Sequence, residues 1–172
     1  MVRSLLFTVA LSFAAPVFMA ATATPAFALS EKKLEAMKED VDYHKDRYKE
    51  IEKIASGVIK DLEKDKADDA DEAHKVLKAF YKDELAGLRA KGIETVDDGD
   101  IPADPTRVDN EPEEIPKEKL EELRDLCVDL KGMTPSEKPK PYTSKLEAYV
   151  ATLLERYERK EKRYDEEKEA SK

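Results

Sequence analysis

The chain is poor in the residues that build most metal and cofactor sites. Its 172 residues include one cysteine, two histidines and no tryptophan. A single cysteine excludes an intrachain disulfide and a zinc site made of several thiolates. Two histidines exclude a histidine-rich catalytic metal centre unless carboxylates supply the remaining ligands. We therefore predict no cofactor, and no enzymatic activity, because no convergent set of nucleophile, base and oxyanion donor can be assigned from spacing.

An excess of basic residues is also missing. The chain has 31 Lys and Arg residues against 40 Asp and Glu residues, so its formal net charge is −9. Binding to a phosphate backbone requires a basic surface. The composition therefore indicates a protein that does not bind nucleic acid.

What is present begins with an export signal. Arg3 precedes a mostly apolar stretch from Leu5 to about Ala23, and Pro25 is followed by the small-residue site Ala26-Phe27-Ala28. This order is typical of a cleaved signal peptide. We predict that residues 1–28 are removed and that the protein is periplasmic or extracellular, without stable membrane insertion after cleavage. Cleavage after residues 21–23, or an uncleaved membrane anchor, are the alternatives.

Apolar residues then recur every three or four positions, which predicts a helix over residues 30–66 with Ser30 as its N-cap. The pattern breaks at Asp65 and resumes in a new phase, which predicts a second helix over 69–91 capped by Asp68 or Asp69. We favour an antiparallel hairpin over one continuous helix. The first stripe consists of Leu34, Met37, Val41, His44, Tyr48, Ile51, Ala55, Val58 and Leu62.

Lys91-Gly92-Ile93 predicts the end of the second helix, because glycine adopts the left-handed conformation that closes many helices. A third helix is predicted over 116–131, where Lys131-Gly132-Met133 repeats the same kind of stop. Three prolines then predict a stiff, extended connector over 134–141, followed by a last helix over 143–169.

Four amphipathic helices must bury their apolar stripes against one another. The predicted fold is therefore all-α: a single helical domain over 29–172, forming an antiparallel four-helix bundle or extended helical hairpins with coiled-coil character. The predicted helices differ in length, so the ends of the first and last can protrude as a stalk or dimerise.

Nearly all of the excess negative charge lies in the proline-containing segment 93–116, whose net charge is −8. Clustered carboxylates suit hard cations such as Ca²⁺. Asp97, Asp98 and Asp100 are the candidate cation ligands, although their spacing does not match an EF-hand loop. The alternative is a solvated acidic spacer.

A tyrosine stripe on the last helix is the candidate partner-binding surface. Tyrosine is enriched among interface anchors, but it also lines the edges of helical cores. The stripe consists of Tyr142, Tyr149, Tyr157 and Tyr164.

Three further side chains have two interpretations each. Cys127 lies on the apolar face of the third helix, and we expect it to be a buried small hydrophobe and not a cross-link between chains. His44 falls within the first stripe, where a polar residue usually sets helix register, although it could ligate haem or a metal. His74 is expected to be exposed near the start of the second helix.

These patterns predict a protein that acts through contacts with a protein partner or with itself, as a scaffold, adaptor, chaperone-like protein or secreted effector. The alternative is a helical-bundle carrier of a cofactor or small ligand. The exported b-type cytochromes are similar in size and helix count, and Met37 resembles their first haem ligand. However, the second half of the predicted last helix lacks the histidine that this resemblance requires.

Overall fold

The computed structural model describes residues 26–94 and 115–172, with side chains in the first segment from residue 31 onwards. In these ranges all regular secondary structure is helical, which confirms the predicted all-α class for the part described. The predicted signal peptide lies outside these ranges, except for its last three residues, which form the first turn of α1. The helices are α1 (Ala26–Glu63), α2 (Ala67–Ala90), α3 (Lys117–Gly132) and α4 (Pro139–Ala170).

The break between the first two helices is where the sequence predicted it. Asp65 has a φ of 55°, a left-handed conformation that Asp tolerates better than most residues. The Lys66 N–H donates to the Asp61 carbonyl at 2.8 Å, closing the turn. Two separate helices therefore form, and the single continuous helix is wrong.

Both predicted N-caps are wrong. Ser30 lies inside α1, which begins at Ala26. The residue that caps α2 is Lys66, whose side chain makes no capping hydrogen bond, and Asp68 and Asp69 lie in the first turn. Their negative charges there still interact favourably with the positive end of the helix dipole.

The predicted glycine stop is confirmed for α2. Gly92 has a φ of 80°, the Gly92 N–H donates to the Arg89 carbonyl at 2.9 Å, and the Ile93 N–H donates to the Leu88 carbonyl at 3.0 Å. This is the Schellman arrangement, in which the apolar residue after glycine packs back on the helix. Ile93 is accordingly buried.

The prediction that α3 ends in the same way as α2, with a left-handed glycine after the helix, is wrong. Gly132 is the last residue of the helix, and Met133 turns the chain away with an extended backbone, at φ −85° and ψ 146°. The predicted connector is also not extended: Glu137 and Lys138 both donate backbone hydrogen bonds to the Thr134 carbonyl. α4 begins four residues earlier than predicted, because Pro139 occupies a first-turn position where its missing N–H costs nothing.

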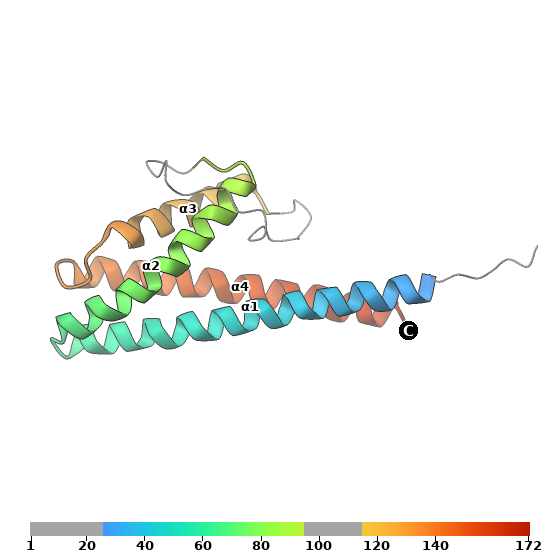
Figure 1. Cartoon of the computed structure of the whole chain (residues 1–172), viewed down its shortest axis with the longest axis horizontal. Coiled ribbons are helices and arrows are strands. Elements are labelled where there is room, and N and C mark those ends of the chain that lie inside the picture. The colour runs from blue at the N-terminus through green and yellow to red at the C-terminus, as the bar shows by residue number, and fades with distance from the viewer. Residues whose placement is uncertain (1–25, 95–114) are drawn as a thin grey trace, which may run out of the picture.

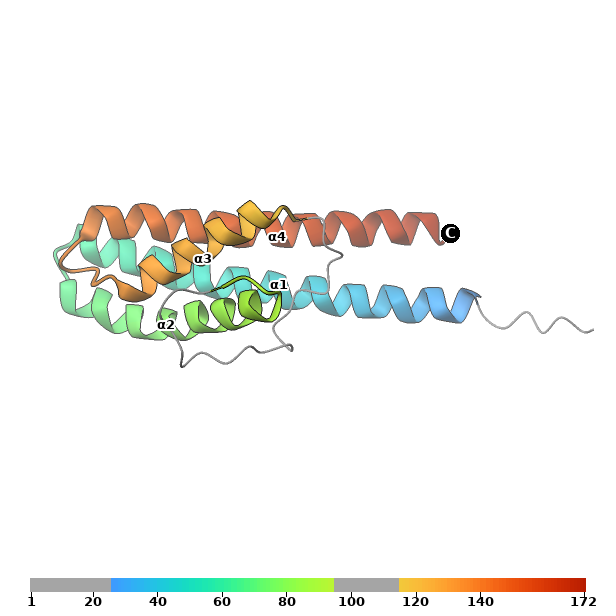
Figure 2. The same ribbon diagram turned by 90° about the horizontal axis from the view of Figure 1, so that it is seen from above.

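The four helices pack in a closed order in which α1 contacts α2, α2 contacts α3, α3 contacts α4 and α4 contacts α1. Chain-sequential neighbours run in opposite directions, as does the α1–α4 pair (Figure 1). α2 and α3 lie together on one side of the α1–α4 pair and cover only part of its length (Figures 1 and 2).

This arrangement divides the described chain into two parts. In the body, all four helices surround one apolar core, which starts at Ile51 on α1 and ends at Leu153 on α4. In the arm, which we define as residues 26–44 of α1 and 157–170 of α4, only these two helices run side by side (Figure 2). Among the residues described, no helix combines the length and apolar character needed to cross a membrane.

Candidate functional site: the groove between α3 and α4

A groove of about 660 Å³ runs between α3 and α4. Its floor is apolar because each helix turns part of a hydrophobic stripe towards it. On α3, Leu123 is buried in the core, whereas Leu120 and Leu126 are only partly buried and border the groove. On α4, the small side chains of Ala148 and Thr152 keep the floor low.

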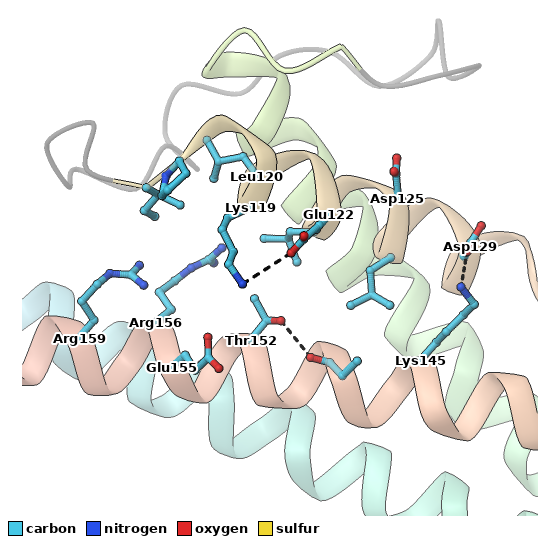
Figure 3. A pocket seen from close by; sticks show the side chains of 15 residues that line it. Lys119, Leu120, Glu122, Asp125, Asp129, Lys145, Thr152, Glu155, Arg156 and Arg159 are labelled. Atoms are coloured by element: carbon cyan, nitrogen blue, oxygen red, sulfur yellow. Dashed lines mark hydrogen bonds and ion pairs between the residues drawn. The ribbon is translucent and has the colours of Figure 1, made fainter.

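The first end of the groove, near the start of α3, carries three basic side chains, Lys119, Arg156 and Arg159, and two acidic ones, Glu122 and Glu155. Figure 3 shows Arg156 and Arg159 rising from α4 towards the start of α3, and Lys119 reaching down from α3. The Lys119 ammonium lies 3.7 Å from the Glu122 carboxylate, and both side chains are exposed. Lys119 is exposed and Arg159 is partly exposed, so these two cations lie at the rim of the groove.

The second end, near the α3–α4 connection, carries two acidic side chains, Asp125 and Asp129, each of which is paired with a basic residue. Lys145 on α4 forms an ion pair with Asp129 on α3, and Asp125 is bound by its neighbour Arg124 at 2.7 Å. The Lys145–Asp129 pair is the polar link that joins the two walls (Figure 3).

Arg156 anchors the first end of the groove to the core. Its guanidinium donates to both oxygens of Glu84 on α2, at 2.6 and 3.2 Å, and both side chains are close to fully buried. Burial alone would raise the pKa of Glu84, but the guanidinium beside it holds that pKa below its usual range. This bidentate pair fixes the position of Arg156 in the groove wall.

The structure places only half of the tyrosine stripe where a partner could touch it. Tyr142 and Tyr149 are fully buried, so they belong to the core. Tyr157 is partly buried and stacks on Tyr48 of α1, with ring centroids 6.4 Å apart. Tyr164 is also partly buried, and the Lys168 ammonium lies 5.4 Å from the centre of its ring. Neither Tyr157 nor Tyr164 borders the groove between α3 and α4.

The expected exposure of His74 is wrong. His74 is only 5% exposed, and its Nδ1 lies 2.7 Å from the Tyr142 hydroxyl. Burial lowers the pKa of His74 to about 4, and the charge of Lys78 adds to this effect against the opposing influence of Asp71. The Tyr142 hydroxyl also lies 3.4 Å from that of Tyr81, so a small polar cluster crosses the core between α2 and α4.

His44 and Cys127 lie in different surroundings. His44 is buried in the arm and its Nε2 lies 3.5 Å from Asp40. Within the residues described, no group of three or more His, Cys, Asp or Glu side chains could hold a metal ion. Cys127 is a free thiol in the core, as predicted, and burial raises its pKa well above the usual value. The candidate cation ligands Asp97, Asp98 and Asp100 lie outside the described residues.

Comparisons with known proteins returned no match. No protein-family model, no curated protein sequence and no solved structure matches this chain.

Proposed function

We propose that this is an exported, non-enzymatic helical protein that acts by binding a partner protein in the groove between α3 and α4. In this proposal the signal peptide 1–28 is removed, and the body is the antiparallel four-helix bundle that the sequence predicts. The proposal rests on one observation: Leu120 and Leu126 are partly exposed in a groove that has an apolar floor and charged rims. Such grooves are the usual receptors of amphipathic helices.

The chemistry of the rims defines the occupant. Ala148 and Thr152 leave room on the floor for larger apolar side chains from a helix lying along the groove. Lys119 and Arg159 favour an acidic C-terminal turn at the first end, whereas the charge of Arg156 is already balanced by Glu84. Asp125 and Asp129 favour the N-terminus of the same helix at the second end. The partner is therefore an amphipathic helix with acidic residues near its C-terminus.

A bulky residue on the floor tests this proposal. Ala148→Trp fills the groove without entering the core, because Ala148 is exposed in the free protein. Ala151→Trp is the matched control, since Ala151 is an exposed alanine of the same helix and does not line the groove. A photo-reactive amino acid at position 126 should cross-link to a partner segment of the stated chemistry. The A148W substitution should reduce that cross-linking by at least about tenfold, and A151W should leave it unchanged.

Two results would count against a helical partner. One is a cross-linking yield that A148W and A151W reduce equally. The other is a cross-link to a small molecule, which would favour the carrier alternative. That alternative has support of its own, because about 660 Å³ lies within the range of small-ligand pockets, roughly 300–1,000 Å³. Native mass spectrometry of protein from its own source separates the two functions, since a carrier retains an added small mass.

A further inference from the structure

The arm has a face that is the direct continuation of the surface covered by α2 and α3 in the body. On α1, Arg47 contacts α2 through the Phe80 carbonyl and Asp83. At about 100° per residue, Asp40, Ala36 and Lys33 follow Arg47 along the same side of the helix. On α4, Arg163 and Ala170 in the same way follow Arg156 and Thr152, which face α3.

This arm face is open, and it is hollowed into a second groove of about 650 Å³. Met37 is partly exposed there and Ala36 is exposed. Two ion pairs cross the groove between the helices: Lys33 to Glu167 and Lys160 to Asp40, each at 2.5 Å. The other charged residues that line it are Arg163 and Glu166, both on α4. Glu166 lies 3.8 Å from the Lys162 ammonium in an exposed pair, which is weak enough to exchange for another partner.

We propose that a second copy of this chain covers the arm face, so that two arms pack face to face in a symmetric dimer. The face carries three basic and three acidic side chains, so two copies can meet on it without net repulsion between like charges. The positions of α2 and α3 determine the orientation of the two copies. Since both helices stand on the side of the arm face (Figure 1), two arms docked in parallel would force the two bodies into the same space. The arms must therefore run antiparallel, with α4 against α4 and α1 against α1.

The ion pairs of the arm determine the register. Because Lys33 lies opposite Glu167 and Asp40 lies opposite Lys160, the Arg163–Glu166 segment of α4 is level with Ala36 and Met37 of α1. A two-fold axis at this level places Arg163 of each copy beside Glu166 of the other. It also places Ala36 and Met37 of one copy against Ala36 and Met37 of the other. The contact thus has an apolar centre and two reciprocal ion pairs.

The size of the contact predicts its strength. The arm portion of α1 is about 28 Å long and the two helices together are about 20 Å wide. The face therefore covers about 500 Å² per copy, or about 1,000 Å² in total, which is the lower end for specific interfaces. We expect a reversible dimer whose population depends on protein concentration.

Sedimentation of protein purified after expression of the full chain tests the dimer. From about 1 to about 500 µM, the weight-average mass should rise from that of the monomer towards twice that value. Arg163→Glu and Glu166→Arg should each weaken the dimer by at least about tenfold, because each places like charges together. The double variant R163E/E166R should return the affinity to within about threefold of the original, since the reciprocal pairs form again with their signs exchanged.

A matched control and a second readout complete the test. Asp165→Arg changes a charge on the opposite side of α4 and should leave the affinity unchanged, while circular dichroism checks that every variant stays folded. Under oxidation, Ala36→Cys should cross-link two chains, whereas Glu35→Cys, at an exposed position on the far side of α1, should not. A protein that stays monomeric at about 500 µM, or a double variant that is no tighter than the single ones, would overturn the proposal. Arg163 and Glu166 do not line the groove between α3 and α4, so this result is independent of the proposed function.

Discussion

The body and the arm use the same two helices but hold them together by different means. In the body, α1 and α4 meet through fully buried apolar side chains such as Ile51, Val58 and Leu146. In the arm they meet through ion pairs such as Lys33 with Glu167, whose side chains are largely exposed. The change coincides with the point where α2 and α3 stop covering the pair.

This difference shows how covering helices determine the role of a charge. The Glu84–Arg156 pair is almost fully enclosed and joins α2 to α4 across the core. In the Asp40–Lys160 pair of the arm, Lys160 is buried but Asp40 is one-third exposed. Solvent reaches the second pair because neither α2 nor α3 extends over this part of the α1–α4 pair (Figure 2). The body should therefore be sensitive to the loss of a charge partner, and the arm should tolerate it.

Removing Glu84 tests this comparison with the largest expected effect. Glu84→Leu leaves the Arg156 guanidinium buried without its carboxylate, and we expect a loss of about 3–5 kcal/mol in the free energy of unfolding. Asp40→Leu in the arm should cost less, about 1–2 kcal/mol, because Asp40 is one-third exposed and the long Lys160 side chain can turn its ammonium towards water once the carboxylate is gone. Urea unfolding at a concentration where the protein is monomeric measures both values. The double variant E84L/R156M is the control, and it should recover most of the loss. Equal losses for Glu84→Leu and Asp40→Leu would remove the distinction between body and arm.

Two leucines make the same comparison with apolar groups. Leu146 is fully buried in the body, whereas Leu34 is partly exposed in the arm. Leu146→Ala should lower the free energy of unfolding by about 2–5 kcal/mol. Leu34→Ala should lower it by less than about 1 kcal/mol, since less apolar surface returns to water. Hydrogen exchange of the unmodified protein should agree, with faster exchange in the arm than in the body. A Leu34 effect as large as that of Leu146 would mean that the arm belongs to the core.

The parts of this fold that were predictable from sequence depend on local periodicity. The three-and-four spacing from Leu34 to Leu62, and its interruption at Asp65, predicted the α1–α2 hairpin because helix period and phase are properties of one segment. The Gly92 stop was predictable for the same reason. The start of α4 was missed because prolines read as an extended connector, although proline is also favourable in the first turn of a helix.

The site depends on which helices are neighbours, and periodicity alone does not specify that. Tyr142 and Tyr149 share a stripe with Tyr157 and Tyr164, yet α2 covers only the first two. One sequence signal could have marked His74 as buried. It lies three residues before Leu77, which places both residues on the buried face of α2. The groove exists because α3 and α4 diverge, which follows from the packing of all four helices.

Acid should destabilise the body and the arm in different pH ranges. The pKa of His74 falls from 6.5 in the unfolded chain to about 4 in the body. The unfolded state therefore binds the proton first, and stability decreases as the pH falls from about 6.5 to 4, by up to about 3 kcal/mol. In the arm, His44 and Lys160 outweigh the effect of burial and lower the pKa of Asp40 from 3.8 to about 2. The stability that Asp40 contributes is present above pH 3.8 and is lost as the pH falls towards 2.

Urea unfolding as a function of pH separates these two contributions. His74→Gln keeps a hydrogen-bonding side chain beside Tyr142 but does not titrate, so the loss between pH 6.5 and 4 should shrink. Asp40→Asn should leave the loss of stability between pH 6.5 and 4 unchanged and should reduce only the loss of stability below pH 3.8. If His74→Gln left the profile above pH 4 unchanged, the destabilisation there would have another source.

The smallest expected effects distinguish three hydroxyl groups along α4. The Tyr142 hydroxyl is hydrogen-bonded to His74. The Tyr149 hydroxyl is buried without a hydrogen-bond partner among the described residues. The Tyr157 hydroxyl donates a hydrogen bond to Glu161 at the surface of the arm. Tyr142→Phe should cost about 1–2 kcal/mol, because His74 Nδ1 loses its partner. Tyr149→Phe should be neutral or stabilise the protein by up to about 1 kcal/mol, since it removes an unsatisfied polar group. Tyr157→Phe should stay within about 0.5 kcal/mol of zero. Thermal unfolding of the three variants measures this order, and a destabilising Tyr149→Phe would show that its hydroxyl is satisfied in the core.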